Sequence, residues 1–263
     1  MSSEFKSKKI KELSALARGQ LTGRFSIAIP AVLIITVIET VASGLTQVNT
    51  LSVSETGYLL SIIITLVVDL LMGIFIYGES VFFLKIARGN QEVSFSDIFS
   101  GFKGLTDKTI VVQSVFTLFS LLSLVPTLLI HYGLVFIPEE YLPLSYVGRM
   151  VLELIILFVC QLYFGMSFYV LSDHPEWTPS EVLRESLLIM HNKKGKLLLT
   201  YLSVIPLFIV SILTFGIGIF WFMPYMQTLL ANFYLDSVKE DAWSPFNETK
   251  TPSDGSTTLD IRL

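Results

Sequence analysis

Apolar residues along the chain fill long uninterrupted runs, and charged residues collect in the shorter segments between them. A run of about 20 residues in an α-helix rises roughly 30 Å, which matches the hydrocarbon thickness of a bilayer. The pattern therefore predicts an all-α polytopic membrane protein with six transmembrane helices, arranged as three hairpins. The predicted spans cover about residues 26–45, 58–78, 110–130, 146–171, 197–214 and 217–235.

A segment with an apolar stripe at helical spacing comes before the first predicted hairpin. In residues 4–21 the stripe is formed by Ile10, Leu13, Ala17 and Leu21, and basic residues share the segment. This pattern is typical of a basic helix that lies on an anionic membrane surface. The alternative is that this segment is a solvent-exposed stretch that precedes the first span. We favour the surface helix because the apolar residues recur at helical spacing.

Two later segments follow the same plan. The sequence SFSDIFSGFKG allows Ser94 or Ser96 to cap a short helix with an aromatic side. In residues 173–196, either Thr178 or Ser180 can act as the cap. Each predicted hairpin is therefore expected to follow an amphipathic interfacial helix.

The last apolar stretch, residues 197–235, is nearly uncharged and long enough for two spans joined by a very tight turn. The glycines of Thr214-Phe-Gly-Ile-Gly218 suit such a turn, although a single long span is the alternative. The expected domains are a basic cytoplasmic helix at residues 1–25, a six-span membrane domain at 26–236 and a disordered cytoplasmic tail at 237–263.

Composition and charge support a membrane location. The chain has 52% hydrophobic and 15% charged residues, whereas a soluble domain carries about 25% charged residues. Apart from Arg149, which falls in a predicted span, basic residues are confined to alternate polar segments, and the other loops carry none. The positive-inside rule then predicts a multi-pass protein of the cell membrane with both termini in the cytoplasm.

Four ionisable residues lie inside the predicted spans and form a candidate intramembrane polar site. Arg149 is expected to pair with Glu153 or with Glu39, because all three fall in the outer third of their spans. Asp69 falls near the middle of its span, where a carboxylate is costly. We expect it to be either a hydrogen-bonding staple, with Gln227 or Asn232 as the partner, or a proton or cation site.

A second set of candidate residues is basic and lies at the inner ends of the spans. Clustered basic side chains at this depth are expected to contact anionic lipid headgroups. The set comprises Lys8, Lys9, Arg18, Arg88, Lys193, Lys194 and Lys196.

Three sequences, FLKIARG followed by FSDIFSGFKG, then SEVLRESLLIMHNKKGKLLL, and finally GIGIFWFMPYMQTLLANFYLDS, together resemble an uncharacterised bacterial family of multi-span membrane proteins, domain-of-unknown-function family 975. The resemblance covers about residues 5–238 and departs from the family pattern at Val125-Pro126-Thr127. It implies a bacterial membrane location and no established activity. The repeated segments are also distantly similar to the membrane domain of some glycerophosphodiester phosphodiesterases, which would imply lipid contact.

The sequence offers no constellation for catalysis. Its histidines lack metal spacing, and it contains no zinc-protease, serine-hydrolase or nucleotide-binding motif. We expect a non-enzymatic protein with no cofactor and no nucleic-acid partner, in a structural, lipid-contacting or transporter-accessory role. Its partners would be membrane lipids and a membrane protein such as a transporter. The alternative function is a small transporter that uses intramembrane carboxylates.

Overall fold

The computed structural model describes residues 8–50, 55–131 and 138–242, and every regular element in these ranges is helical. The elements are α1 (Ile10–Leu21), α2 (Phe25–Thr50), α3 (Glu55–Ala87), η1 (Phe95–Phe102), α4 (Thr106–His131), η2 (Glu139–Tyr141), α5 (Leu142–Phe164), α6 (Ser167–Asp173), α7 (Pro179–Met190), α8 (Lys194–Leu213) and α9 (Ile219–Ala242). The predicted all-α class is confirmed for this part of the chain.

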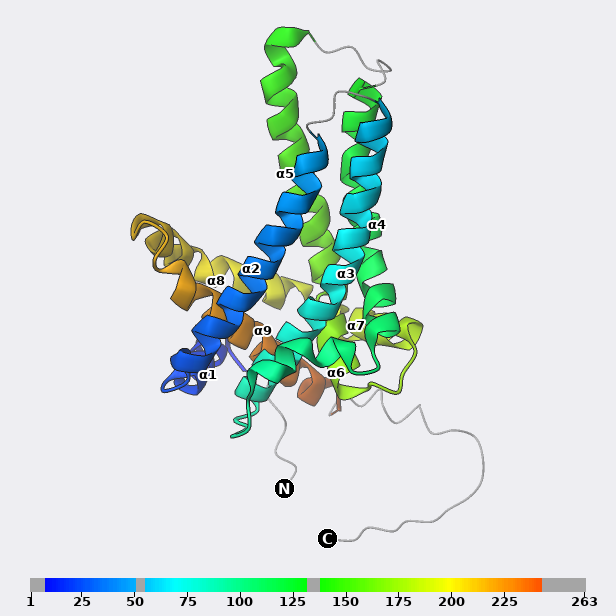
Figure 1. Ribbon diagram of the computed structural model, residues 1–263. Helices are drawn as coiled ribbons and strands as arrows, with labels where there is room; N and C mark the ends of the chain where they lie inside the picture. The colour runs from blue at the N-terminus through cyan, green and yellow to red at the C-terminus, as the bar shows by residue number, and fades with distance from the viewer. Residues whose placement is uncertain (1–7, 51–54, 132–137, 243–263) are drawn as a thin grey trace, which may run out of the picture.

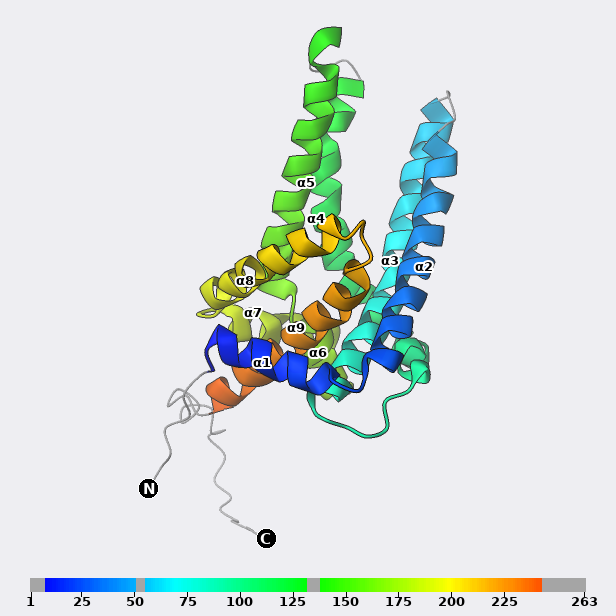
Figure 2. The same ribbon diagram turned by 90° about the vertical axis from the view of Figure 1, so that its left-hand side faces the viewer.

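The helices form two long hairpins standing on a layer of short helices. Figure 1 shows the α2–α3 and α4–α5 hairpins rising from the same foot, where α1, η1, α6 and α7 gather. Figure 2 shows the two hairpins diverging toward their far ends, while α8 and α9 form a shorter hairpin that lies obliquely to them. The short helices therefore occupy one end of the molecule, where the two long hairpins begin and end.

Helix α9 is the centre of the foot. It contacts α1, α2, α3, α7 and α8, and its Leu229 and Phe233 are fully buried. The apolar stripe of α1 packs into the same core, because Leu13, Ala17 and Leu21 are almost completely buried. The stripe predicted to face lipid is thus covered by protein, which corrects the expectation that α1 uses that face to lie on a membrane.

Four helical segments of the described chain are long and apolar enough to cross a membrane: Phe25–Gly44, Leu60–Ala87, Met150–Asp173 and Lys194–Leu213. A fifth is obtained if η1 and α4 form one span bent by 87°. Helix α9 is not among them, although residues 217–235 were predicted as the sixth span. Polar residues such as Thr228 and Asn232 in the middle of α9 lower its mean hydropathy, so the helix is less apolar than the four candidate spans. The chain is a helical protein with several candidate spans, and the six-span arrangement is not established.

The last apolar stretch folds as two helices, as the glycines predict. Phe215 and Gly216 both have positive φ angles in the turn between α8 and α9, and the Gly218 amide donates to Thr214 Oγ1 over 2.9 Å. Helix α9 continues to Ala242, so the fold extends beyond the predicted boundary at residue 236. The rest of the predicted tail, residues 243–263, lies outside the described residues.

The predicted helix starts at Ser94 and Thr178 are confirmed. Each side chain caps its helix as part of a capping box. The element after Ser94 is a 3-10 helix that packs closely on α3. A Cβ on Gly78 would collide with the backbone of Ile98, and a Cβ on Gly101 would lie 2.6 Å from the Ile74 carbonyl oxygen. Glycine on both elements therefore permits backbone contact between η1 and α3.

Candidate functional site

Three of the four ionisable residues predicted inside the membrane have described side chains, and each of these lies within electrostatic reach of another carboxylate. Asp69 interacts electrostatically with Glu153, and Glu39 does so with another carboxylate, Glu79. Asp69 therefore has a second acidic residue nearby. The side chain of Arg149 lies outside the described part of the structure, so its pairing with Glu153 or Glu39 stays a prediction.

The amides expected to bond Asp69 have other partners. Gln227 is hydrogen-bonded to Glu79. Asn232 forms a reciprocal amide pair with Gln20, at 2.6 Å and 3.2 Å. Gln20 also donates to the Ala87 carbonyl over 2.6 Å. Neither amide is bonded to Asp69 among the described residues, and the choice between a hydrogen-bonding staple and a proton or cation site at Asp69 stays a prediction.

A cavity of about 340 Å³ lies where the long hairpins meet the foot. It is bordered by α3, α4, α5, α6 and α9, so it opens between segments that are far apart in the sequence. Half of its lining residues are polar. The lining comprises Ile76, Glu79, Ser80, Gln113, Phe116, Leu157, Gln161, Gly165, Phe168, Tyr169, Gln227 and Leu230.

Glu79 is the only Asp, Glu, Lys or Arg among these lining residues. It reaches the cavity because α3 continues without a break to Ala87, about two turns beyond Glu79. Ser80, the next residue, donates its hydroxyl to the Ile76 carbonyl over 2.9 Å and stays in the helix wall. Gln227 of α9 lies within reach of the Glu79 carboxyl group, so the two residues face each other across the helices.

Gln113 is the second notable polar group in the cavity. Its side chain is 9% exposed, and α4 approaches α3 closely beside it, where a Cβ on Gly73 would lie 2.5 Å from Gln113 Cβ. No hydrogen bond to its amide is found among the described residues. The amide lies at the cavity wall, where it is available to bond a molecule that enters the cavity.

The remaining walls combine amide and aromatic groups. Gln161 of α5 is hydrogen-bonded to Tyr201, and Tyr169 interacts electrostatically with Glu79. The rings of Phe116 and Phe168 stack with their centroids 6.1 Å apart. The cavity thus offers one carboxyl group, three amides and a flat apolar wall, with no Lys or Arg among its described lining residues.

Several basic residues predicted to contact lipid headgroups are used inside the foot. Lys196 pairs with Asp236 at 2.6 Å, and the buried Lys193 donates to the Ser237 carbonyl over 2.7 Å. Arg88 is bonded to both carboxylate oxygens of Asp173, each at 2.7 Å. These contacts join α3, α6, α8 and α9 to one another, so the three side chains have structural partners in the protein.

The other basic residues of that set differ in exposure. Lys194 lies over the ring of Tyr163, 3.6 Å from its centroid, while Lys8 is half-buried. Lys9 and Arg18 are exposed, as is Arg88 despite its ion pair. Headgroup contact therefore stays a prediction, and it fits Lys9 and Arg18 best because they have no ion pair among the described residues.

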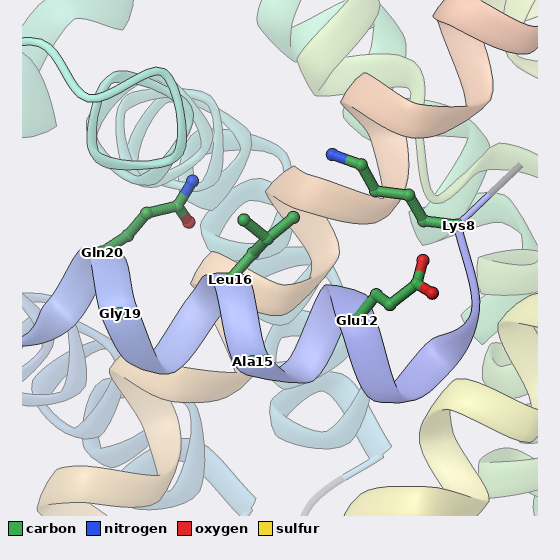
Figure 3. Close-up of a pocket in the computed structure, with 6 residues that line it drawn as sticks. All are labelled: Lys8, Glu12, Ala15, Leu16, Gly19 and Gln20. Carbon is green, nitrogen blue, oxygen red and sulfur yellow. The ribbon is translucent and has the colours of Figure 1, made fainter. Parts of the chain in front are cut away.

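A second hollow, of about 600 Å³, lies along one side of α1 (Figure 3). Figure 3 shows Lys8, Leu16 and Gln20 pointing toward the same side of the helix. Its lining comes from residues 8–20 alone, and the Gln20 amide already bonds Asn232 and Ala87. It is a shallow surface with no convergent polar groups, so the Glu79 cavity is the stronger candidate.

Sequence reasoning missed the Glu79 site because it ended the second span at residue 78. The residues that follow Glu79 include Val81, Phe82 and Phe83, so the apolar pattern continues past the carboxylate. A further signal was available in the lone glutamines of three otherwise apolar segments, Gln113, Gln161 and Gln227. Isolated polar residues in apolar helices face a helix bundle or a cavity, and these three do so here.

The described residues contain no group of three or more His, Cys, Asp or Glu side chains that could hold a metal ion. No curated protein and no solved structure matches the chain. The expected similarity to the membrane domain of glycerophosphodiester phosphodiesterases therefore has no supporting match. A family model described as "Protein of unknown function (DUF975)" matches residues 1–241. The chain belongs to that family.

Proposed function

We propose that this chain is a multi-pass protein of the cell membrane that binds a small solute in the Glu79 cavity, as a small transporter would. The observation that carries the proposal is the convergence of Glu79, Gln113, Gln161 and Gln227 from four helices on one cavity. Binding pockets are commonly found between helices of a bundle, and they combine apolar walls with a few convergent polar groups. A purely structural role gives no reason for such a cavity.

The contacts at the foot support both termini lying on one side of the membrane. The backbone amide of Lys8 donates to the Asp236 carboxylate over 3.2 Å and 3.3 Å, so the two ends of the described fold touch. A chain whose ends lie on one side crosses the membrane an even number of times. We therefore propose four crossings by α2–α5, or six if α8 and α9 also cross, with the basic foot in the cytoplasm.

A lipid-contacting role of the foot is the second candidate function, and it can accompany the first. Phe95, Phe99 and Phe102 of η1 are each at least 40% exposed, and η1 lies at 87° to α4. If α4 crosses the membrane, η1 lies along the membrane plane, where exposed aromatic residues are favoured. Exposed Lys9 and Arg18 on α1 would add attraction to anionic lipids.

Solute binding can be tested with a variant that fills the cavity and a matched variant that does not. Leu157 lines the cavity, while Leu154, one turn earlier on α5, is 67% exposed. We expect at least one class of small polar solute to raise the melting temperature of the full chain in lipid nanodiscs. The effect should persist in Leu154→Trp and disappear in Leu157→Trp. If no solute distinguishes the two variants, the proposed function is wrong.

A further inference from the structure

We infer that the Glu79 cavity selects a small organic cation with a primary ammonium group and an apolar body. This inference rests on the proposed function and names the chemical class of its ligand. The juxtaposition that carries it is the Glu79 carboxyl group in the same cavity lining as the amides of Gln113 and Gln227 and the stacked rings of Phe116 and Phe168.

The charge of the cavity favours a cation. Glu79 faces the cavity, Glu39 adds a second carboxylate within electrostatic reach, and no Lys or Arg appears among the described lining residues. An anion would meet repulsion without a compensating positive group. A charged ligand buried in a site of low dielectric needs an opposite charge, and Glu79 provides one only for a cation.

The donor and acceptor pattern favours an ammonium group over a metal ion. A primary ammonium carries three N–H donors and no acceptor. The carboxylate of Glu79 and the amide oxygens of the cavity supply acceptors of this kind, and the Gln113 amide is unpaired among the described residues. A bare divalent ion prefers six or more oxygen ligands in a tight shell, whereas this cavity has one carboxylate and a volume of about 340 Å³.

The aromatic wall favours a ligand with an apolar body. Phe116 and Phe168 present stacked rings, and Tyr169 lies beside them in the lining. Such rings bury apolar surface and attract a cation placed over their faces. The volume lies at the lower end of the range for ligand pockets, roughly 300–1,000 Å³, so the ligand is small.

The inference can be tested with phenethylammonium and its uncharged counterpart 2-phenylethanol, by calorimetric titration of the full chain in nanodiscs. Phenethylammonium should bind the wild type at least about tenfold more tightly than 2-phenylethanol, because a hydrogen bond to a charged group is worth more than a neutral one. Glu79→Gln should weaken the binding of phenethylammonium at least about tenfold and leave the affinity for 2-phenylethanol unchanged. Glu153→Gln, which alters a carboxylate outside the cavity lining, is the matched control.

The outcomes separate the inference from the proposed function. Equal affinity for the alcohol and the ammonium, or an ammonium affinity that Glu79→Gln leaves unchanged, would overturn the cation assignment. The cavity function would then still stand if Leu157→Trp abolished binding of the preferred probe. If neither probe bound, or if Leu157→Trp left the binding unchanged, the cation assignment and the proposed function would both be contradicted. Should Glu79→Gln fail to fold, Gln113→Leu provides the second test, with a weaker ammonium affinity expected.

Discussion

The Nζ atom of Lys196 lies 2.6 Å from a carboxylate oxygen of Asp236, and the Asp236 side chain is 2% exposed. This ion pair joins the first turn of α8 to the C-terminal part of α9. The same carboxylate accepts the backbone amide of Lys8, so three segments distant in the sequence meet at one buried charge. A carboxylate in such a position is stable only while its partners remain.

Removing one partner of this pair should therefore destabilise the fold. We expect Lys196→Met to lower the free energy of unfolding by about 3 kcal/mol, because it leaves a buried carboxylate with less compensation. Lys9→Met changes an exposed lysine and should change the stability by less than about 0.5 kcal/mol. Thermal denaturation in detergent compares the two, and equal melting temperatures would show that the ion pair contributes nothing.

The contact between η1 and α3 should be intolerant of a side chain at Gly78. A Cβ at this position would collide with the Ile98 backbone, so Gly78→Ala should displace η1 and destabilise the protein by about 1–3 kcal/mol. A Cβ on Gly44 of α2 would meet nothing within 4 Å, and Gly44→Ala should be neutral or slightly stabilising. Hydrogen exchange of residues 95–102 measures the displacement, and unchanged protection in Gly78→Ala would contradict it.

The start of α7 should depend on pH. Hydrogen bonds from the Thr178 amide and hydroxyl, each 2.8 Å long, lower the pKa of the Glu181 carboxyl below its usual 4.5. A lowered pKa stabilises the helix at pH values above 4.5, and this contribution is lost as the pH falls through the lowered pKa. Hydrogen exchange of α7 should therefore be slower in the wild type than in Glu181→Gln near pH 7, and the two should converge in acid.

A difference between wild type and Glu181→Gln that persisted at low pH would show that the charge is not responsible. Thr178→Ala serves as the companion variant, because it removes the cap itself. It should weaken the helix start by about 1 kcal/mol near pH 7, and part of this effect should persist in acid because the Thr178 hydroxyl also accepts from the Glu181 amide.

The sequence predicted the helices well because their signals are local. Apolar runs, capping residues such as Ser94 and Thr178, and the glycine turn before α9 are all set by neighbouring residues. The role of α9 could not be read in the same way. The sequence predicted α9 correctly as a helix. Its polar residues Thr228 and Asn232 are buried against other helices, and this packing, which decides whether α9 contacts lipid, is not visible in the sequence of α9 alone.

The candidate site was harder to predict because its residues come from several helices. Asp69 was selected for its depth in a span, a property that one helix defines. The importance of Glu79 depends on Gln113 and Gln227, which only the packing of α4 and α9 brings near it. Likewise, Lys196 was predicted to face lipid because Asp236, 40 residues away, could not be identified as its partner.

The most direct test of a solute-accessible cavity is cysteine labelling in a Cys160→Ser background. Thiols react as thiolates, which form in water and not in hydrocarbon. Gln113→Cys, in the cavity lining, should react with a small hydrophilic thiol reagent in native membranes, and combining it with Leu157→Trp should block the reaction. Leu118→Cys, on the same helix and 62% exposed on its outer surface, should stay unlabelled. Failure of Gln113→Cys to react, or labelling at both positions alike, would contradict the account.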